Sequence, residues 1–160
     1  MKTKFFFFSL TILALILSAC ASATPAPKPA VPVTGLSNGA ANPSGPAAVN
    51  VGQNAALGSF LVDSKGMTLY LFTKDTPNTS NCYGSCATYW PPLLTKGAAL
   101  AGNGVTASML GTTARTDGTS QVTYNGWPLY YYASDKAAGD TTGENVKGVW
   151  FVVTPAGVQK

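Results

Sequence analysis

The chain has 160 residues, a formal net charge of +4 and no His. This length allows one small domain with appendages, and the lack of His removes the commonest general base and the most frequent zinc and copper ligand. Lys2 and Lys4 lie in a segment that we expect to be cleaved, which leaves eight basic against six acidic residues. So weak and scattered a charge argues against nucleic acid as a partner.

Residues 1–19 have the features of an export signal. A positively charged start precedes an apolar run of 13 residues, Phe5 to Leu17, which is shorter than the roughly 20 residues that span a bilayer. The run ends in Leu17-Ser18-Ala19-Cys20, which resembles the lipobox of bacterial lipoproteins. The resemblance predicts that Cys20 carries a diacylglycerol group, with palmitate among its acyl chains, and anchors the chain to a membrane. The alternative is an ordinary secretory signal that happens to contain a Cys.

Residues 20–50 join Cys20 to the domain, and we expect them to form a disordered tether. Residues 21–50 include six Pro and a single charged residue, Lys28. Their short apolar side chains cannot offset the entropy lost on ordering a backbone. The folded domain is therefore expected at residues 51–158.

A β-hairpin is predicted at the start of this domain. Two apolar runs, Phe60 to Asp63 and Met67 to Phe72, flank a turn that contains Gly66. In the second run Tyr70 and Phe72 point to one face, and the leucines between them point to the other. Both faces are apolar, so we expect this strand to be covered on both sides.

Asp75 follows the strand and precedes Thr76-Pro77-Asn78. This context predicts that the carboxylate accepts backbone N–H bonds and closes a turn. A catalytic role would need a second titrating partner, and no other carboxylate lies near Asp75 in the sequence.

The next passage contains Cys82 and Cys86, four positions apart. In an exported protein we expect a disulfide that closes a small loop, worth about 2 kcal/mol. The alternative is a Cu(I) or redox site that recruits Met67 or Met109, although such sites normally include a His. A helical turn is expected from Gly84 to Tyr89.

The second half repeats the first with a longer hairpin. Lys96 to Asn103 reads as a loop, and Val105 to Leu110 is expected to form one or two helical turns. Asp117-Gly118 predicts a hairpin turn, and Asn125-Gly126 a second one. Leu129 to Ala133 then repeats the central strand.

The loop after that strand contains Asp135, Asp140 and Glu144. Their spacing does not match a calcium-binding EF-hand loop, and we interpret them as solvated loop acids. Gly148 to Thr154 is predicted to be the final strand.

A constant offset of sixty residues relates the two halves. Repeat 1 spans about residues 57–96 and repeat 2 about residues 110–155. The identities that fall on this offset are Val62 and Val122, Gly66 and Gly126, Leu69 and Leu129, Tyr70 and Tyr130, Asp75 and Asp135, and Trp90 and Trp150. We expect the paired Trp and Tyr residues to pack in a shared core.

Both central strands fit one pattern, Y-x-[FWY]-x-x-D, in which the residues are Tyr70, Phe72, Asp75, Tyr130, Tyr132 and Asp135. With the lipobox and the Cys-x3-Cys-x3-Trp-Pro-Pro passage, the chain resembles a bacterial and archaeal family of predicted lipoproteins with a conserved Yx(FWY)xxD motif, also called secreted repeats of unknown function. The resemblance implies an exported, lipid-anchored repeat domain of the cell envelope. It implies no activity, and in it we interpret these residues, together with Trp90 and Trp150, as structural.

We therefore expect a mainly β domain of two tandem repeats with one or two short helices, either a barrel or a sandwich. The sequence favours a non-enzymatic lipoprotein without a cofactor, which binds or scaffolds envelope components and has an unknown envelope protein as its partner. One alternative is a copper- or redox-linked accessory of a membrane electron-transfer chain. Another is glycan binding through exposed rings such as Trp127, Tyr131 and Tyr83.

Overall fold

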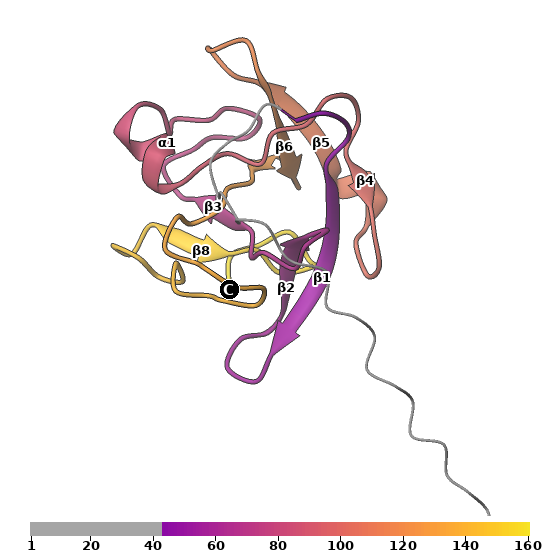
Figure 1. The fold of residues 1–160 in the computed structure, drawn as a ribbon, viewed down its shortest axis with the longest axis vertical. Helices are drawn as coiled ribbons and strands as arrows, with labels where there is room; N and C mark the ends of the chain where they lie inside the picture. The colour runs from indigo at the N-terminus through magenta and orange to yellow at the C-terminus, as the bar shows by residue number, and fades with distance from the viewer. Residues whose placement is uncertain (1–42) are drawn as a thin grey trace, which may run out of the picture. The chain divides into compact units, whose positions relative to one another are not determined.

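The computed structural model describes residues 43–160, which belong to one compact unit. The predicted signal, Cys20 and most of the tether lie outside the described residues. The described elements are β1 (Ala48–Asn54), β2 (Gly58–Asp63), β3 (Tyr70–Phe72), α1 (Ser85–Tyr89), β4 (Leu100–Ala101), the 3-10 helix η1 (Ala107–Met109), β5 (Leu110–Ala114), β6 (Ser120–Tyr124), β7 (Trp127–Pro128) and β8 (Trp150–Val152) (Figure 1).

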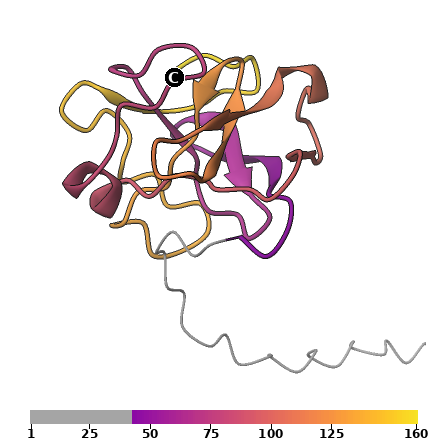
Figure 2. The same ribbon diagram turned by 90° about the horizontal axis from the view of Figure 1, so that it is seen from above.

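The strands form three small open sheets, in the orders β2-β1-β4, β3-β8 and β5-β6-β7, and none of them closes into a barrel. The prediction of a mainly β domain with little helix is confirmed. In both views α1 lies on the opposite side of the domain from β1 (Figures 1 and 2). Within residues 43–160, no helix has the length and apolar character needed to cross a bilayer.

The strand β1 was not expected. The tether was predicted to reach Asn50, but β1 begins at Ala48 and pairs with β2 over six residues, from Val49 opposite Asp63 to Asn54 opposite Gly58. The short apolar residues here are ordered because they lie against a strand that the rest of the core already fixes. The predicted pairing of β2 with the following strand is reduced to one bridge, between Val62 and Thr68.

The second hairpin follows the sequence closely. Asp117-Gly118 lies in the loop between β5 and β6, and Asp117 accepts the N–H of Thr119 at 3.0 Å. Asn125 and Gly126 join β6 to β7 with φ angles of 48° and 80°, a left-handed conformation that Asn and Gly tolerate best. The short helix α1 and the 3-10 helix η1 occupy the two places where helical turns were predicted.

The central strands exchange partners between the repeats. β3 of repeat 1 pairs with β8 of repeat 2, and Tyr130 of repeat 2 forms a bridge with Pro92 of repeat 1. At the crossing point Tyr70 and Tyr130 bond each other's backbone through two N–H···O contacts of 2.8 and 2.9 Å. The central strand of each repeat is therefore hydrogen-bonded to a segment of the other repeat.

An approximate twofold axis passes through this crossing point. The backbone bond from Thr73 to Val149 has a counterpart sixty residues later in the bond from Ala133 to Tyr89, and both measure 2.9 Å. The bond from Val153 to Leu69 likewise corresponds to that from Leu93 to Leu129. The sequence repeat is thus a symmetry of the fold.

The core consists of two clusters, one on each face of β3. Leu69 and Leu71 lie in the first cluster with aliphatic residues of β2 and β6. Tyr70 lies in the second with Phe72 packed against it, together with Trp90, Tyr130 and Trp150. The prediction of a central strand covered on both sides is confirmed, with mainly aliphatic side chains on one face and mainly aromatic side chains on the other.

Candidate functional site

Two tyrosine–aspartate pairs lie at the centre of the domain, and each joins the two repeats. The Tyr70 hydroxyl donates to Asp135 Oδ2 at 2.6 Å, and the Tyr130 hydroxyl donates to Asp75 Oδ2 at 2.6 Å. All four residues are buried. The tyrosine of each motif therefore bonds the aspartate of the other motif, which sequence spacing alone did not indicate.

The second oxygen of each carboxylate closes its own loop. Asp75 Oδ1 accepts the N–H of Asn81 at 2.7 Å, and Asp135 Oδ1 accepts the N–H of Thr142 at 3.0 Å. The turn-closing role predicted for Asp75 is confirmed. Our interpretation of Asp135 as a solvated acid was wrong, because Asp135 is only 1% exposed.

Burial controls the protonation of these pairs. Loss of solvent raises the pKa of both Asp75 and Asp135 above the ordinary value of 3.8, although their hydrogen bonds oppose this shift. Burial, with the neighbouring carboxylate, also raises the pKa of Tyr70 and Tyr130 far above the ordinary value of 10.0. The tyrosines are therefore neutral hydrogen-bond donors at neutral pH.

Arg115 is a buried cation that the sequence did not single out. Its guanidinium donates to Ser80 Oγ at 2.8 Å, to Gln121 Oε1 at 2.7 Å and to the Cys82 carbonyl at 2.8 Å. Its side chain also forms an ion pair with the half-exposed Asp117 at 3.4 Å. Within residues 43–160, every buried side-chain nitrogen or oxygen has a hydrogen-bond partner.

Ser80 connects this cation to one of the tyrosine–aspartate pairs. Ser80 Oγ lies 2.8 Å from the Tyr130 hydroxyl, which in turn bonds Asp75. The positive charge of Arg115 acts to lower the pKa of Asp75, but burial outweighs it. Arg115 is therefore linked to the Tyr130–Asp75 pair through the Ser80 hydroxyl.

Above the pairs, four aromatic rings stack in a column. Trp90 and Trp150 are parallel within 1°, with centroids 3.9 Å apart. Tyr132 stacks on Trp90 at 4.2 Å, and Phe72 stacks on Trp150 at 4.1 Å. The expected packing of the paired Trp residues is confirmed, and each repeat contributes two rings.

The paired tyrosines meet this column edge-on. The ring centroids of Tyr70 and Trp90 lie 5.4 Å apart, and those of Tyr130 and Trp150 lie 5.2 Å apart. Gly143 packs closely against both Tyr70 and the column, because a Cβ atom there would lie 2.8 Å from Tyr70 Cζ and 2.9 Å from Trp90 Cη2. The structure thus brings together the six motif residues and the two Trp residues that were interpreted as structural.

One side of the column forms the floor of a surface groove with a volume of about 580 Å³. The groove is lined by Phe72, Ser85, Cys86, Tyr89, Trp90, Tyr132, Val146, Lys147, Val149 and Trp150. Most of these residues form pairs related by the offset of sixty, so the groove lies on the approximate twofold axis. Lys147 is its only charged lining residue.

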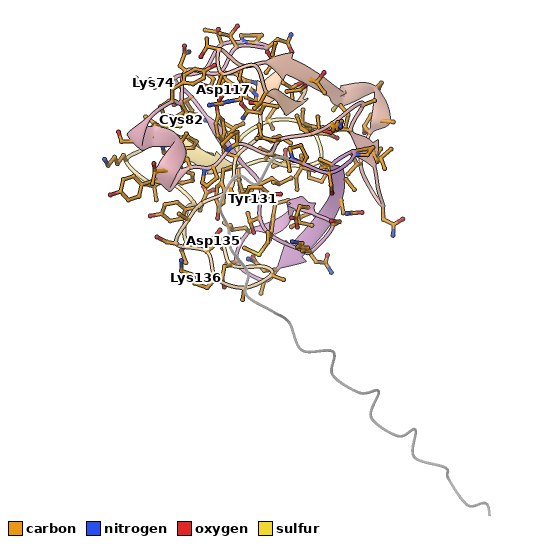
Figure 3. The ribbon with its side chains drawn as sticks, turned by 45° about the horizontal axis from the view of Figure 1, so that its top comes forward. Lys74, Cys82, Asp117, Tyr131, Asp135 and Lys136 are labelled. Atoms are coloured by element: carbon orange, nitrogen blue, oxygen red, sulfur yellow. A yellow bond between two sulfur atoms is a disulfide. The ribbon has the colours of Figure 1, made fainter. Side chains whose placement is uncertain are left out.

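The predicted disulfide between Cys82 and Cys86 is present, with the two Cα atoms 5.3 Å apart. Cys82 is buried beside α1 (Figure 3). Cys86, in α1, lines the groove. In this form neither sulfur is a thiolate, so Cu(I) binding through them would first require reduction. In the described part of the chain, no three His, Cys, Asp or Glu residues gather closely enough to hold a metal ion.

The rings suggested for glycan binding are not the ones that line the groove. Trp127 and Tyr131 are half-buried against the aliphatic cluster, and the Tyr131 hydroxyl donates to Asp63 at 3.1 Å. Tyr83 lies beneath the Arg115 guanidinium, 4.3 Å from it. Tyr89 on α1, which no sequence pattern singled out for glycan binding, lines the groove and is 65% exposed.

Comparison with known proteins agrees with the repeat seen in the fold. The family model described as a secreted repeat of unknown function matches residues 53–94 and again residues 111–154. Neither a curated protein nor a solved structure matches the sequence. The two matched segments are the halves that exchange strands, and together they cover more than half of the chain, which therefore belongs to the family of secreted repeats of unknown function.

Proposed function

We propose that this protein is a non-catalytic binding module of the cell envelope and that the groove over the aromatic column is its ligand site. The observation that carries the proposal is the composition of the groove: five aromatic rings, a single charged residue and no carboxylate line it. Its volume of about 580 Å³ is typical of sites for small molecules.

The ligand class that suits this groove is an uncharged saccharide. Aromatic rings bind the apolar C–H faces of sugar rings, and the hydroxyls of Ser85, Tyr89 and Tyr132 can bond the sugar hydroxyls. The Lys147 ammonium adds one hydrogen-bond donor to the groove lining and can pair with an acidic substituent on the saccharide. A cationic ligand is disfavoured, because no lining carboxylate would neutralise it.

The chemistry of the centre supports a binding role rather than catalysis. The two carboxylates that could act as acids or bases are buried, bonded by tyrosine hydroxyls and absent from the groove lining. The groove itself offers hydroxyls and one amine but no acid–base pair.

The test of the groove is a printed array of neutral and acidic oligosaccharides, followed by titration of any hit with tryptophan fluorescence as the readout. We expect binding that quenches or shifts the emission of Trp90 and Trp150, and that Phe72→Ala and Tyr89→Ala weaken. Leu100→Ala, at an exposed position outside the groove, is the matched control. An array without hits, or a hit that the groove variants leave unchanged, would exclude saccharide binding here.

We further propose that lipid at Cys20 holds the module at a membrane surface, where its partner is an envelope protein. Support comes from the lipobox-like Leu17-Ser18-Ala19-Cys20 and from membership of a secreted family. Detergent phase separation tests the anchor. The wild-type protein should enter the detergent phase and Cys20→Ala the aqueous phase, whereas equal partition of both would contradict the proposal.

A further inference from the structure

The arrangement of oxidisable rings at the centre carries a second, independent inference. Indole and phenol are the side chains that lose an electron most readily, and here they are ordered rather than scattered. The indoles of Trp90 and Trp150 overlap face to face at 3.9 Å, and one tyrosine meets each of them edge-on. When two parallel rings overlap at this separation, a positive charge spreads over both and becomes easier to form.

Each of the two tyrosines also has a proton acceptor in place. A phenol gives up an electron easily only when its proton leaves at the same time. The Tyr70 and Tyr130 hydroxyls point at carboxylate oxygens 2.6 Å away, which is within the range for direct proton transfer. Burial keeps water away from both hydrogen bonds, so the carboxylate is the acceptor.

We propose that the Trp90–Trp150 pair and the two tyrosine–aspartate pairs form an electron donor that reduces one-electron oxidants of the extracellular space, such as peroxide-derived radicals. The oxidant takes one electron from the indole pair, which becomes a cation shared by both rings. Tyr70 or Tyr130 then returns an electron to the pair and transfers its proton to Asp135 or Asp75. The products are a neutral indole pair, a neutral tyrosyl radical and a protonated carboxyl group, so charge and atoms balance.

The groove gives small oxidants access to this donor. Trp90 and Trp150 are 6% and 3% exposed, yet both line the groove together with the outer rings of the column. An electron can therefore leave over a short distance, while the resulting tyrosyl radical stays buried. Packing alone does not require the carboxylates, because a phenylalanine would fill the same space as either tyrosine.

Laser flash-quench oxidation of the full chain, with a ruthenium polypyridyl complex as photosensitiser and an irreversible electron acceptor, tests the proposal. We expect a transient near-infrared band, the signature of a charge shared by two stacked rings. It should decay into tyrosyl absorbance, more slowly in deuterated water because a proton moves. If the wild-type protein shows no near-infrared band, the proposal is overturned without recourse to any variant.

Variants then assign the roles. Trp150→Phe should abolish the near-infrared band, whereas Trp127→Phe should keep it, because Trp127 lies outside the column. The double variant Tyr70→Phe with Tyr130→Phe should lose the tyrosyl signal and prolong the indole cation. Tyr131→Phe is the control, since Tyr131 also bonds an aspartate but makes no ring contact with the column that we describe. Tyrosyl signal that persists in the double variant, or that disappears in Tyr131→Phe, would contradict the assignment.

Circular dichroism in the far ultraviolet checks that each variant is folded. Tyr70→Phe and Tyr130→Phe as single variants keep one proton-coupled pair each, so we expect the tyrosyl signal to persist in either variant and to form more slowly than in the wild type. The outcome does not depend on saccharide binding, so it separates this proposal from the proposed binding function.

Discussion

At the scale of single residues, the tyrosine hydroxyls satisfy carboxylates that belong to the other repeat. A hydrogen bond to a charged group contributes about 1.5 to 3 kcal/mol, and its removal here leaves a buried acceptor with one partner fewer. We expect Tyr70→Phe and Tyr130→Phe each to lower the free energy of unfolding by about 2 kcal/mol in urea titrations. Tyr89→Phe, at an exposed ring, should change it by less than about 0.5 kcal/mol.

The exchange of partners makes a sharper prediction for pairs of substitutions. Tyr70→Phe should couple with Asp135→Asn by about 1 kcal/mol or more, because these residues share a hydrogen bond, and should be nearly additive with Asp75→Asn. Urea unfolding of the single and double variants measures both coupling energies. If Tyr70→Phe coupled with Asp75→Asn and not with Asp135→Asn, the pairing of tyrosines with aspartates described above would be wrong.

The buried carboxylates also determine a pH dependence. Burial raises the pKa of Asp75 and Asp135 in the folded state above the ordinary value of 3.8. Between that value and the folded-state pKa the folded protein binds more protons than the unfolded chain, so the contribution of these groups to stability falls as pH rises. It is fully present below pH 3.8 and is lost as pH rises through the raised pKa.

Comparison of variants with the wild type isolates this effect. Asp117 and Asp140 have lowered pKa values and act in the opposite direction, so the pH dependence of the wild-type stability mixes both signs. We expect Asp75→Asn and Asp135→Asn to gain stability relative to the wild type as pH rises from about 4 to about 7, measured by urea midpoints. A stability difference that stays constant over this range, or falls as pH rises, would contradict the raised pKa values.

At the scale of elements, α1 depends on its neighbours for its position. It has five residues, no side-chain cap and no buried residue, and the disulfide joins its second residue to buried Cys82. Replacing both cysteines with Ala should cost about 2 kcal/mol and speed amide exchange over residues 82–90 above all. Wild-type protein treated with a thiol reductant should behave likewise, while exchange that rises equally across the whole domain would contradict a local role.

The elements that the sequence predicted are those with a local cause. The alternation around Tyr70, the Asp117-Gly118 turn and the short loop between Cys82 and Cys86 each depend on a few neighbouring residues, and all of them are present. Strand β1 was missed because its composition is that of a tether, and only pairing with β2 orders it. The hydrogen bonds between the two motifs were not predicted, because nothing in the sequence indicates which of the two aspartates each tyrosine bonds.

Arg115 shows the same limit in the candidate site. Its burial depends on acceptors from two places: Ser80 and Cys82 in the loop before α1, and Gln121 on β6. A lone Arg beside an Asp-Gly turn reads as a solvated residue of a loop. The groove was likewise not predicted from the sequence, because residues of both repeats line it and only the fold brings them together.

At the scale of the whole molecule, the exchanged strands imply that one repeat cannot complete its own core. A fragment of residues 43–103 keeps β3 but loses its partner β8, and residues 104–160 lose the segment that bridges Tyr130. We expect neither fragment to fold as a monomer, and a mixture of the two to regain the near-ultraviolet circular dichroism of the stacked indoles. Analytical ultracentrifugation distinguishes monomers from pairs, and a folded monomeric fragment would refute the interlocked design.

Joining both halves of a twofold assembly in one polypeptide has a genetic consequence. In a dimer of identical subunits every mutation appears twice, whereas here a change enters one side alone. The cystine bridge begins at Cys82 in one loop, and Thr142 occupies the corresponding place in the other. A peripheral loop of one repeat can thus change alone, as the disulfide loop has, while the aromatic rings and carboxylates at the centre keep their approximate twofold symmetry.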